Sequence, residues 1–243
     1  MFMPISAKTL DFLFENKLNN SKEWYHAHKK EYTELVLRPL AELVVKLKPT
    51  MLELDPDLIV EPRVTRSISR IYRDTRFSKD KSLYRDNMWL IFIRDKKLYE
   101  GPPGFYVDIS PRGLSYGMGY YQASADAMRC YREMILGREP AFLKALEAYE
   151  GQKVFSLTGD LYKRSKAPDE PERIRSWVDR KSVDFDCTTT DFNLMFSENL
   201  DQVVAQHFRL LKPVYEFLMA VETRRDHTPP GSRWAGAGAP ESK

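Results

Sequence analysis

The amino-acid sequence predicts an α+β protein in which an antiparallel sheet packs against helices from both ends of the chain. Apolar residues at helical spacing run through positions 21–48 and again through 190–218. Between these stretches, apolar and polar residues alternate over about 105–120, which is the period of a half-buried strand and predicts a central hairpin. Helices that precede and follow a run of antiparallel strands favour α+β over a parallel sheet.

The N-terminal part is predicted to be helical. Ser6 can cap a first short helix, whose apolar residues recur at helical spacing. Ser21 begins a longer amphipathic stripe, which we expect to end before Pro49. Pro39 lies inside that stripe and is expected to kink or divide the helix.

The sheet is predicted from three apolar segments. Residues 88–93 are expected to form a buried strand, and 105–110 and 114–120 to form the two arms of the hairpin. A Gly-x-Ser-x-Gly match at 113–117 resembles a nucleophile elbow, but that motif needs a strand before the serine and a helix after it. Ser115 instead falls in the second hairpin arm, so we interpret the match as a coincidence.

Helices are predicted again after the hairpin. Two of them have a start signal and a glycine just past the end, at Ser124 to Gly137 and at Pro140 to Gly151. The region 152–190 is expected to be irregular, apart from one short strand near 183–185. The last helical region begins at Thr190 or Asp191, and Pro213 should bend it.

Length and charge limit the classes of function. The chain has 243 residues, with 38 Lys and Arg against 35 Asp and Glu, and a net charge of +3. That charge argues against a dedicated nucleic-acid partner, so any electropositive site must be local. We expect one domain over 6–222. The tail at 226–243 is expected to be disordered, because its composition is of low complexity.

The cysteines and histidines give no metal-binding pattern. Cys130 and Cys187 lie far apart with no ligand at metal-binding spacing, and there are four histidines in the whole chain. No run approaches the roughly 20 apolar residues that a membrane helix needs. These observations predict a cytoplasmic protein with reduced thiols, no metal site and no membrane partner. They do not indicate a cofactor.

The segment 63–85 concentrates positive charge and is the strongest candidate for a functional site. Its arginines recur at intervals of three and four, at Arg63, Arg66, Arg70, Arg73 and Arg76. On a helix, the first four would share one face and apolar residues would occupy another, and Pro62 suits a first helical position. We therefore predict a helix over about 62–73.

Residues 74–82 combine hydroxyls, cations and carboxylates without any helical or strand period. Such groups suit a phosphate or carboxylate ligand, because guanidinium groups form charge-assisted, two-pronged hydrogen bonds. We predict an enzyme or binding protein for an anionic small molecule, with ligand-binding residues Arg70, Arg73, Arg76, Ser78, Lys79 and Lys81. Asp74 and Asp80 are the candidate catalytic residues, as a general base or as groups that hold the cations in place.

Two other interpretations of this segment stay open. The first is a structural ion-pair network, in which Asp74 and Asp80 tie adjacent loops together, since clustered charges occur in both settings. The second is a module that binds nucleic acid or an acidic protein surface through the arginine face of the 62–73 helix. That module would lose affinity steeply with added salt.

The string Arg-Ile-Tyr-Arg-Asp-Thr-Arg-Phe-Ser-Lys-Asp-Lys-Ser at 70–82 resembles the hallmark of domain-of-unknown-function family number 2461. Asn-Ser-Lys-Glu-Trp-Tyr at 20–25 and Gly-Phe-Tyr at 104–106 are further points of similarity, and the resemblance spans about 6–222. It implies membership of a family of conserved hypothetical proteins and brings no activity with it. Leu83 stands where that family usually has proline.

Overall fold

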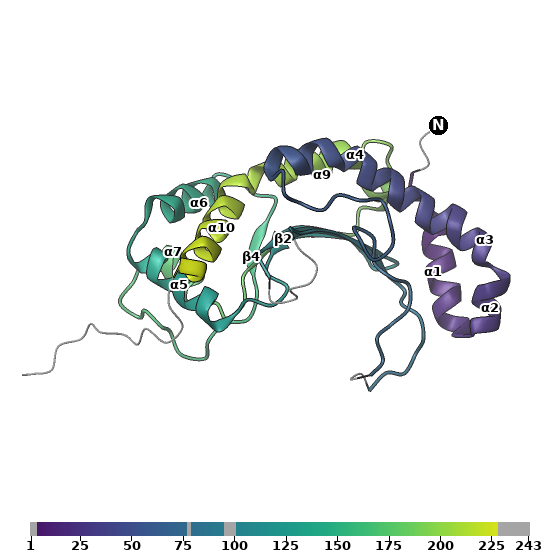
Figure 1. The fold of residues 1–243 in the computed structure, drawn as a ribbon, viewed down its shortest axis with the longest axis horizontal. Coiled ribbons are helices and arrows are strands. Elements are labelled where there is room, and N and C mark those ends of the chain that lie inside the picture. Colours follow the sequence, from purple (N-terminus) through teal and green to yellow (C-terminus); the bar gives the residue numbers. More distant parts are fainter. Residues whose placement is uncertain (1–3, 77–78, 95–100, 228–243) are drawn as a thin grey trace, which may run out of the picture.

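The computed structural model describes residues 4–76, 79–94 and 101–227. It confirms the α+β class, because helices from both ends of the chain surround an antiparallel sheet (Figure 1). The sheet has five strands in the order β1-β2-β3-β5-β4. Their bounds are β1 Met88–Phe92, β2 Gly104–Ser110, β3 Gly113–Gly119, β4 Ser156–Thr158 and β5 Asp184–Thr189.

The predicted hairpin is confirmed as β2 and β3. Its register pairs Gly104 with Gly119 and Val107 with Tyr116, so alternate residues of both strands point to the same face. Gly113 begins β3 with a φ of +138°, which strongly favours glycine. A side chain there would also lie 2.5 Å from the carbonyl oxygen of Thr189, so the turn excludes other residues.

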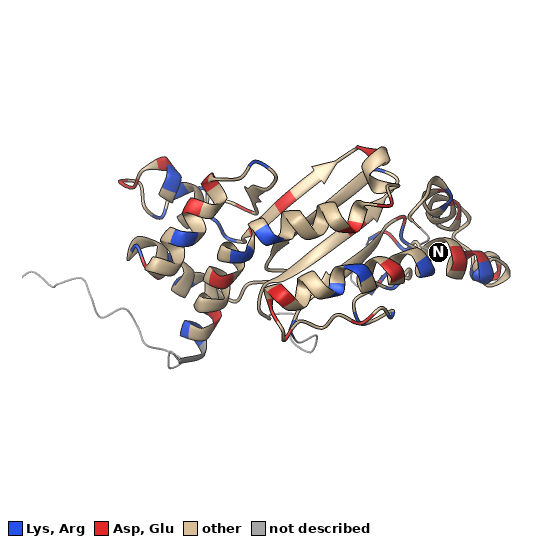
Figure 2. Cartoon of the chain, turned by 90° about the horizontal axis from the view of Figure 1, so that it is seen from above, with Lys and Arg blue, Asp and Glu red and all other residues tan. Residues whose placement is uncertain are grey.

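Two helices cover one face of the sheet. Helices α4 (Arg38–Leu54) and α9 (Leu200–Leu210) lie side by side across it (Figures 1 and 2). The α4 residues that face inward are Leu40, Leu43, Val44 and Leu47 of the predicted apolar stripe, together with Met51. Phe105 of β2 packs against Phe208 of α9 with ring centroids 5.0 Å apart, so aromatic packing joins sheet and helix.

The N-terminal helices lie beyond one end of the sheet. They are α1 (Ala7–Asn19), α2 (Lys22–Ala27), α3 (Lys29–Tyr32) and a π-helical turn, η1 (Thr33–Leu37). The helix is divided near Pro39, as expected. The π-helical turn η1 ends just before α4 begins, and Pro39 lies in the first turn of α4. The expected end before Pro49 is wrong. The helix continues to Leu54, and burial of Met51 and Leu54 offsets the hydrogen bond that proline removes.

A second group of helices lies at the opposite end of the sheet (Figure 1). It comprises α5 (Ala125–Leu136), α6 (Pro140–Glu150), α7 (Glu172–Val178) and α10 (Lys212–His227), while the short α8 (Phe192–Met195) contacts β3. The region 152–190 is more regular than predicted, since it contains β4, α7 and β5. These elements are too short for a periodic apolar pattern to stand out. The bend expected at Pro213 is found as a division into two helices, because α9 ends at Leu210 and α10 begins at Lys212.

The predicted tail starts inside a helix. Asp226 and His227 still belong to α10, and positions 228–243 lie outside the described residues.

The helix predicted over 62–73 is wrong. Thr65 has a φ of +71°, which no right-handed helix accommodates, and the backbone bonds to β1 instead. Ser69 N donates to Trp89 O at 2.9 Å, and Ile91 N donates to Ser67 O at 2.9 Å. The two serine hydroxyls also bond to backbone groups, and the outer edge of β1 offers unpaired partners to this segment. The spacing of the arginines carries no information about these hydrogen bonds to β1, so it could not predict that the segment is not helical.

Candidate anion-binding site

The charged loop at 73–86 is built largely from its own ion pairs. Arg73 lies 3.0 Å from Asp80, and Arg76 lies 2.7 Å from Asp74. The hydrogen bond from Arg76 lowers the pKa of Asp74 to about 2, and the backbone N–H of Ser82 lowers the pKa of Asp80. Both carboxylates are therefore ionised and weakly basic at neutral pH, which favours an ion-pair role over general-base catalysis.

The structure also describes Lys79 and Lys81 of this loop. Lys81 donates to the carbonyl oxygen of Thr75 at 2.8 Å, and Lys79 is exposed. Ser78 lies outside the described residues. Arg63 and Arg66, at the start of the segment, both pair with Glu61.

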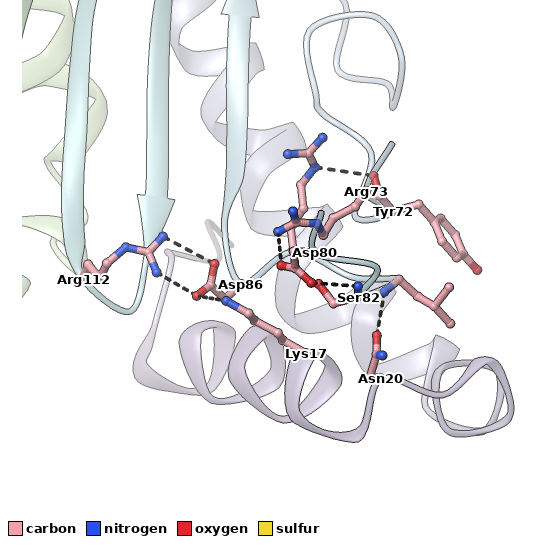
Figure 3. Close-up of polar contacts among 10 residues, drawn as sticks. Lys17, Asn20, Tyr72, Arg73, Asp80, Ser82, Asp86 and Arg112 are labelled. Atoms are coloured by element: carbon pink, nitrogen blue, oxygen red, sulfur yellow. Dashed lines mark hydrogen bonds and ion pairs between the residues drawn. The ribbon is translucent and has the colours of Figure 1, made fainter. Parts of the chain in front are cut away.

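The base of the loop is attached to the body of the protein through Asp86. Asp86 lies 2.8 Å from Lys17 of α1 and 2.7 Å from Arg112 of the hairpin turn (Figure 3). Its side chain is only 16% exposed. Burial opposes ionisation, but the hydrogen bonds from Arg112 and Lys17 outweigh it and lower the pKa of Asp86 to about 2. Asp86 therefore joins three separate parts of the chain.

Leu83 takes part in a second attachment of the loop. Its N–H donates to the side-chain oxygen of Asn20 at 2.6 Å (Figure 3). Its carbonyl accepts from Arg73 N at 2.9 Å. Proline has no N–H, so the residue usual in the family could not make the first bond. Asn20 itself is left-handed, with a φ of 48°, and ends α1. In this chain, leucine and asparagine together dock the loop on α1.

Arg85 lies where the loop meets the sheet. Its guanidinium carbon is 4.6 Å from the ring centroid of Trp89, and its Nε donates to Tyr72 O at 3.4 Å. Burial and the neighbouring charge of Arg73 lower its pKa. The guanidinium groups of Arg73 and Arg85 therefore lie close together at the base of the loop. In the outer part of the loop, the charge of Arg76 is matched by Asp74.

A pocket of about 310 Å³ opens between the N-terminal helices and the segment 64–72. We call it the tyrosine pocket. It is lined by Tyr25, Lys29, Tyr32, Thr33, Leu37, Val64, Arg70, Ile71 and Tyr72. Of the predicted ligand-binding residues that the structure describes, Arg70 alone is among the lining residues. Lys29 contributes a second cation, and neither side chain forms an ion pair within the described part of the chain.

The tyrosines of this pocket pack against one another. The Tyr25 ring centroid is 5.5 Å from those of Tyr32 and Tyr72, and 5.3 Å from that of Tyr84. Tyr84 is fully buried beneath this cluster. Burial raises the pKa values of Tyr25 and Tyr32, so these phenols stay protonated and can donate hydrogen bonds at neutral pH.

Sequence reasoning missed Lys29 and the tyrosines as site residues. Tyr25 and Tyr32 fit the apolar stripe of the helix predicted from Ser21, and this pattern indicates core residues. The available signal was their chemistry, because a buried tyrosine usually needs a hydrogen-bond partner. No spacing in the sequence indicates that they face Arg70.

The antiparallel sheet, with helices on one face and a charged loop attached at its edge, defines an α+β protein with a pocket beside that loop. The chain belongs to the family of conserved hypothetical proteins known as DUF2461, whose profile matches residues 8–217. No curated protein and no solved structure matches it.

None of the helices in 4–76, 79–94 and 101–227 is long and apolar enough to cross a membrane. The same residues contain no group of three or more His, Cys, Asp or Glu placed to hold a metal ion.

Proposed function

We propose that this protein binds a small anionic ligand in the tyrosine pocket, as an enzyme or as a ligand-binding protein. The observation that carries the proposal is the contrast between two sets of cations. Arg63, Arg66, Arg73 and Arg76 each have a carboxylate partner. Arg70 and Lys29 line the pocket and have none within the described residues. A carboxylate or phosphate between them would supply the missing partner.

The lining of the pocket suits a ligand with an apolar body. Leu37, Val64 and Ile71 contribute aliphatic surface, and the tyrosine rings add faces on which a flat or apolar group can pack. The tyrosine hydroxyls can donate further hydrogen bonds to an anion. We therefore expect a ligand in which one acidic group is joined to an aromatic or aliphatic portion.

The ion pairs of the charged loop argue against ligand binding by the arginines of that loop. Ligand binding by Arg73 and Arg76 would require them to leave Asp80 and Asp74, so the structural ion-pair interpretation is supported for these four residues. Binding roles for Ser78, Lys79 and Lys81, and catalytic roles for Asp74 and Asp80, stay predictions. A position in the cytoplasm also stays a proposal, supported by the free thiols of Cys130 and Cys187.

A thermal-shift screen tests the proposal. Carboxylates and phosphate monoesters with apolar groups should raise the unfolding midpoint, because a ligand at 100 times its dissociation constant adds about 2.7 kcal/mol to the free energy of unfolding. The response should be lost in Arg70→Gln and kept in Arg63→Gln, which removes a cation outside the pocket. A broad panel without any response, or equal responses in both variants, would count against it.

The nucleic-acid interpretation predicts a different result. Binding through phosphate contacts loses affinity steeply as salt increases, with a logarithmic slope of about one per phosphate. Because the outer arginines are already paired with carboxylates, we expect no such binding to DNA or RNA. Fluorescence anisotropy with labelled single- and double-stranded oligonucleotides at low and moderate salt distinguishes the two interpretations.

A further inference from the structure

A loop at residues 159–167 carries a second group of cations, at the end of the sheet opposite the N-terminal helices. The loop lies beside α5 and α7, two of the helices at that end (Figure 1). Two hydrogen bonds fix its backbone. Tyr162 N donates to Asp179 O at 2.9 Å, and Lys181 N donates to Asp160 O at 2.7 Å. The loop therefore presents its side chains from a defined position.

The ring of Tyr162 lies among three cationic side chains. From its ring centroid, Lys166 Nζ is 4.5 Å away, the Arg132 guanidinium carbon 5.0 Å and Lys181 Nζ 5.6 Å. The face of an aromatic ring attracts cations, so Tyr162 offsets part of their mutual repulsion. The ring carries no negative charge, so the cluster stays positive.

Two partly buried arginines beside the loop donate to uncharged groups. The Arg132 guanidinium donates to the Tyr162 hydroxyl and to the carbonyl oxygens of Met128, Val178 and Arg180. The Arg180 guanidinium donates to the carbonyl oxygens of Leu157, Gly159 and Ser176. Carbonyl oxygens hold these side chains in place without neutralising them, so two positive charges remain next to the loop.

The exposed cations of this region are also unmatched. Four of them are exposed and form no ion pair within the described residues: Lys163, Arg164, Lys166 and Lys181. The carboxylate of Asp179 is engaged with neutral donors, because it accepts from the Ser165 hydroxyl at 3.1 Å and from Lys166 N at 2.6 Å. The positive charge around Tyr162 is therefore accessible from solvent.

Arginines elsewhere in this group of helices are paired with carboxylates. The pairs are Arg138 with Glu170, Arg173 with Glu150 and Arg175 with Glu172. The unmatched cations around Tyr162 therefore stand out from the surface that surrounds them. Repulsion among like charges destabilises a folded protein, and an acidic partner would remove that repulsion.

An exposed leucine lies among these cations. Leu161, directly before Tyr162, is 52% exposed, and its backbone forms a bridge with Arg180. In protein interfaces, burial of an apolar side chain supplies affinity while surrounding charges select the partner. Single-stranded nucleic acids bind instead through bases stacked on open aromatic faces, and the Tyr162 ring already has cations over it. The composition of this surface therefore favours a protein partner.

We propose that residues 159–167 and Lys181 form a docking surface for an acidic segment of a partner protein, in which carboxylates flank an apolar side chain. We call it the Tyr162 surface, and it is separate from the tyrosine pocket. The carboxylates pair with the exposed lysines, and the apolar side chain packs on Leu161. Residues 228–243 of this chain contain one acidic residue and two basic ones, so the chain's own end is not complementary. The partner is a different protein.

Fluorescence anisotropy with a labelled peptide of Glu-Glu-Leu repeats tests the Tyr162 surface. We expect saturable binding that weakens as salt increases, because salt screens exposed charges. Lys166→Gln combined with Lys181→Gln should weaken binding at least tenfold, and a peptide of Glu-Glu-Ser repeats should bind more weakly than the leucine peptide. Lys8→Gln is the matched control. It changes an exposed lysine on α1, at the other end of the sheet, and should leave the affinity unchanged.

Three results would overturn the proposal. They are the absence of binding by the Glu-Glu-Leu peptide, equal affinity of the double variant and the native protein, and tighter binding of an oligothymidylate than of the peptide, which would assign the surface to nucleic acid. A second measurement needs no variant. In NMR spectra of the native protein, the peptide should shift the amide signals of residues 161–166, and shifts confined to the tyrosine pocket would contradict the proposal.

Discussion

Two neighbouring parts of the basic segment use similar side chains differently. In the charged loop, Arg73 and Arg76 each lie within 3.0 Å of an aspartate from the same loop. Arg70, three residues earlier than Arg73, lines the tyrosine pocket without a carboxylate partner in the described residues. Positive charge in a sequence therefore does not locate an anion site. The site is expected where a cation faces a pocket and its charge is unmatched.

The largest effect is expected at Asp86, which attaches the charged loop to α1 and to the hairpin turn. Asp86→Ala removes the partner of Lys17 and Arg112 and should lower the free energy of unfolding by about 2 kcal/mol, because hydrogen bonds to charged groups contribute more than neutral ones. Urea denaturation measures this, with Glu15→Gln, an exposed change on α1, as the control. Equal midpoints for the two variants would show that Asp86 does not hold the loop.

The same attachment predicts a pH dependence. The folded-state pKa of Asp86, about 2, is below the ordinary value of 3.8. The carboxylate therefore contributes stability above pH 4, and this contribution is lost as pH falls towards 2. The difference in stability between native protein and Asp86→Asn should shrink over that range. A difference that stays constant from pH 6 to pH 2 would refute the role of the ionised carboxylate.

A smaller effect is expected at the second attachment. Leu83→Pro removes the donor to Asn20 and should cost about 1 kcal/mol. Asn20→Gly keeps the left-handed backbone while removing the acceptor, so the two changes together should cost less than their sum. Fully additive costs, measured by denaturant unfolding of the four proteins, would show that this hydrogen bond does not couple loop and helix.

The smallest effect is expected for the outer ion pair of the loop. Arg76 and Asp74 are 77% and 54% exposed, and exposed pairs contribute little because water and salt screen them. Arg76→Gln should leave the unfolding midpoint unchanged within error. A clear loss of stability would mean that the loop depends on this pair and would weaken the contrast with Arg70.

The regular elements could be predicted because their patterns are local. Ser6 and Ser124 precede helices, and alternation at 105–120 identifies the hairpin. The segment 62–73 could not be predicted, because its structure depends on hydrogen bonds to β1, a strand that begins fifteen residues further on at Met88.

The sites were predictable only in part. Arg70, which is predicted from its chemistry to bind a ligand, lines the tyrosine pocket, whereas Lys29 lies on a distant helix and reaches the same pocket through tertiary packing.

The central claim is tested most directly by calorimetric titration of phenyl phosphate into the native protein, Arg70→Gln and Arg76→Gln. Phenyl phosphate combines an acidic group with an aromatic ring. We predict saturable binding that falls at least tenfold, about 1.4 kcal/mol, in Arg70→Gln and is unchanged in Arg76→Gln. Binding that is lost in Arg76→Gln but kept in Arg70→Gln would place the anion on the loop and contradict the assignment to the tyrosine pocket.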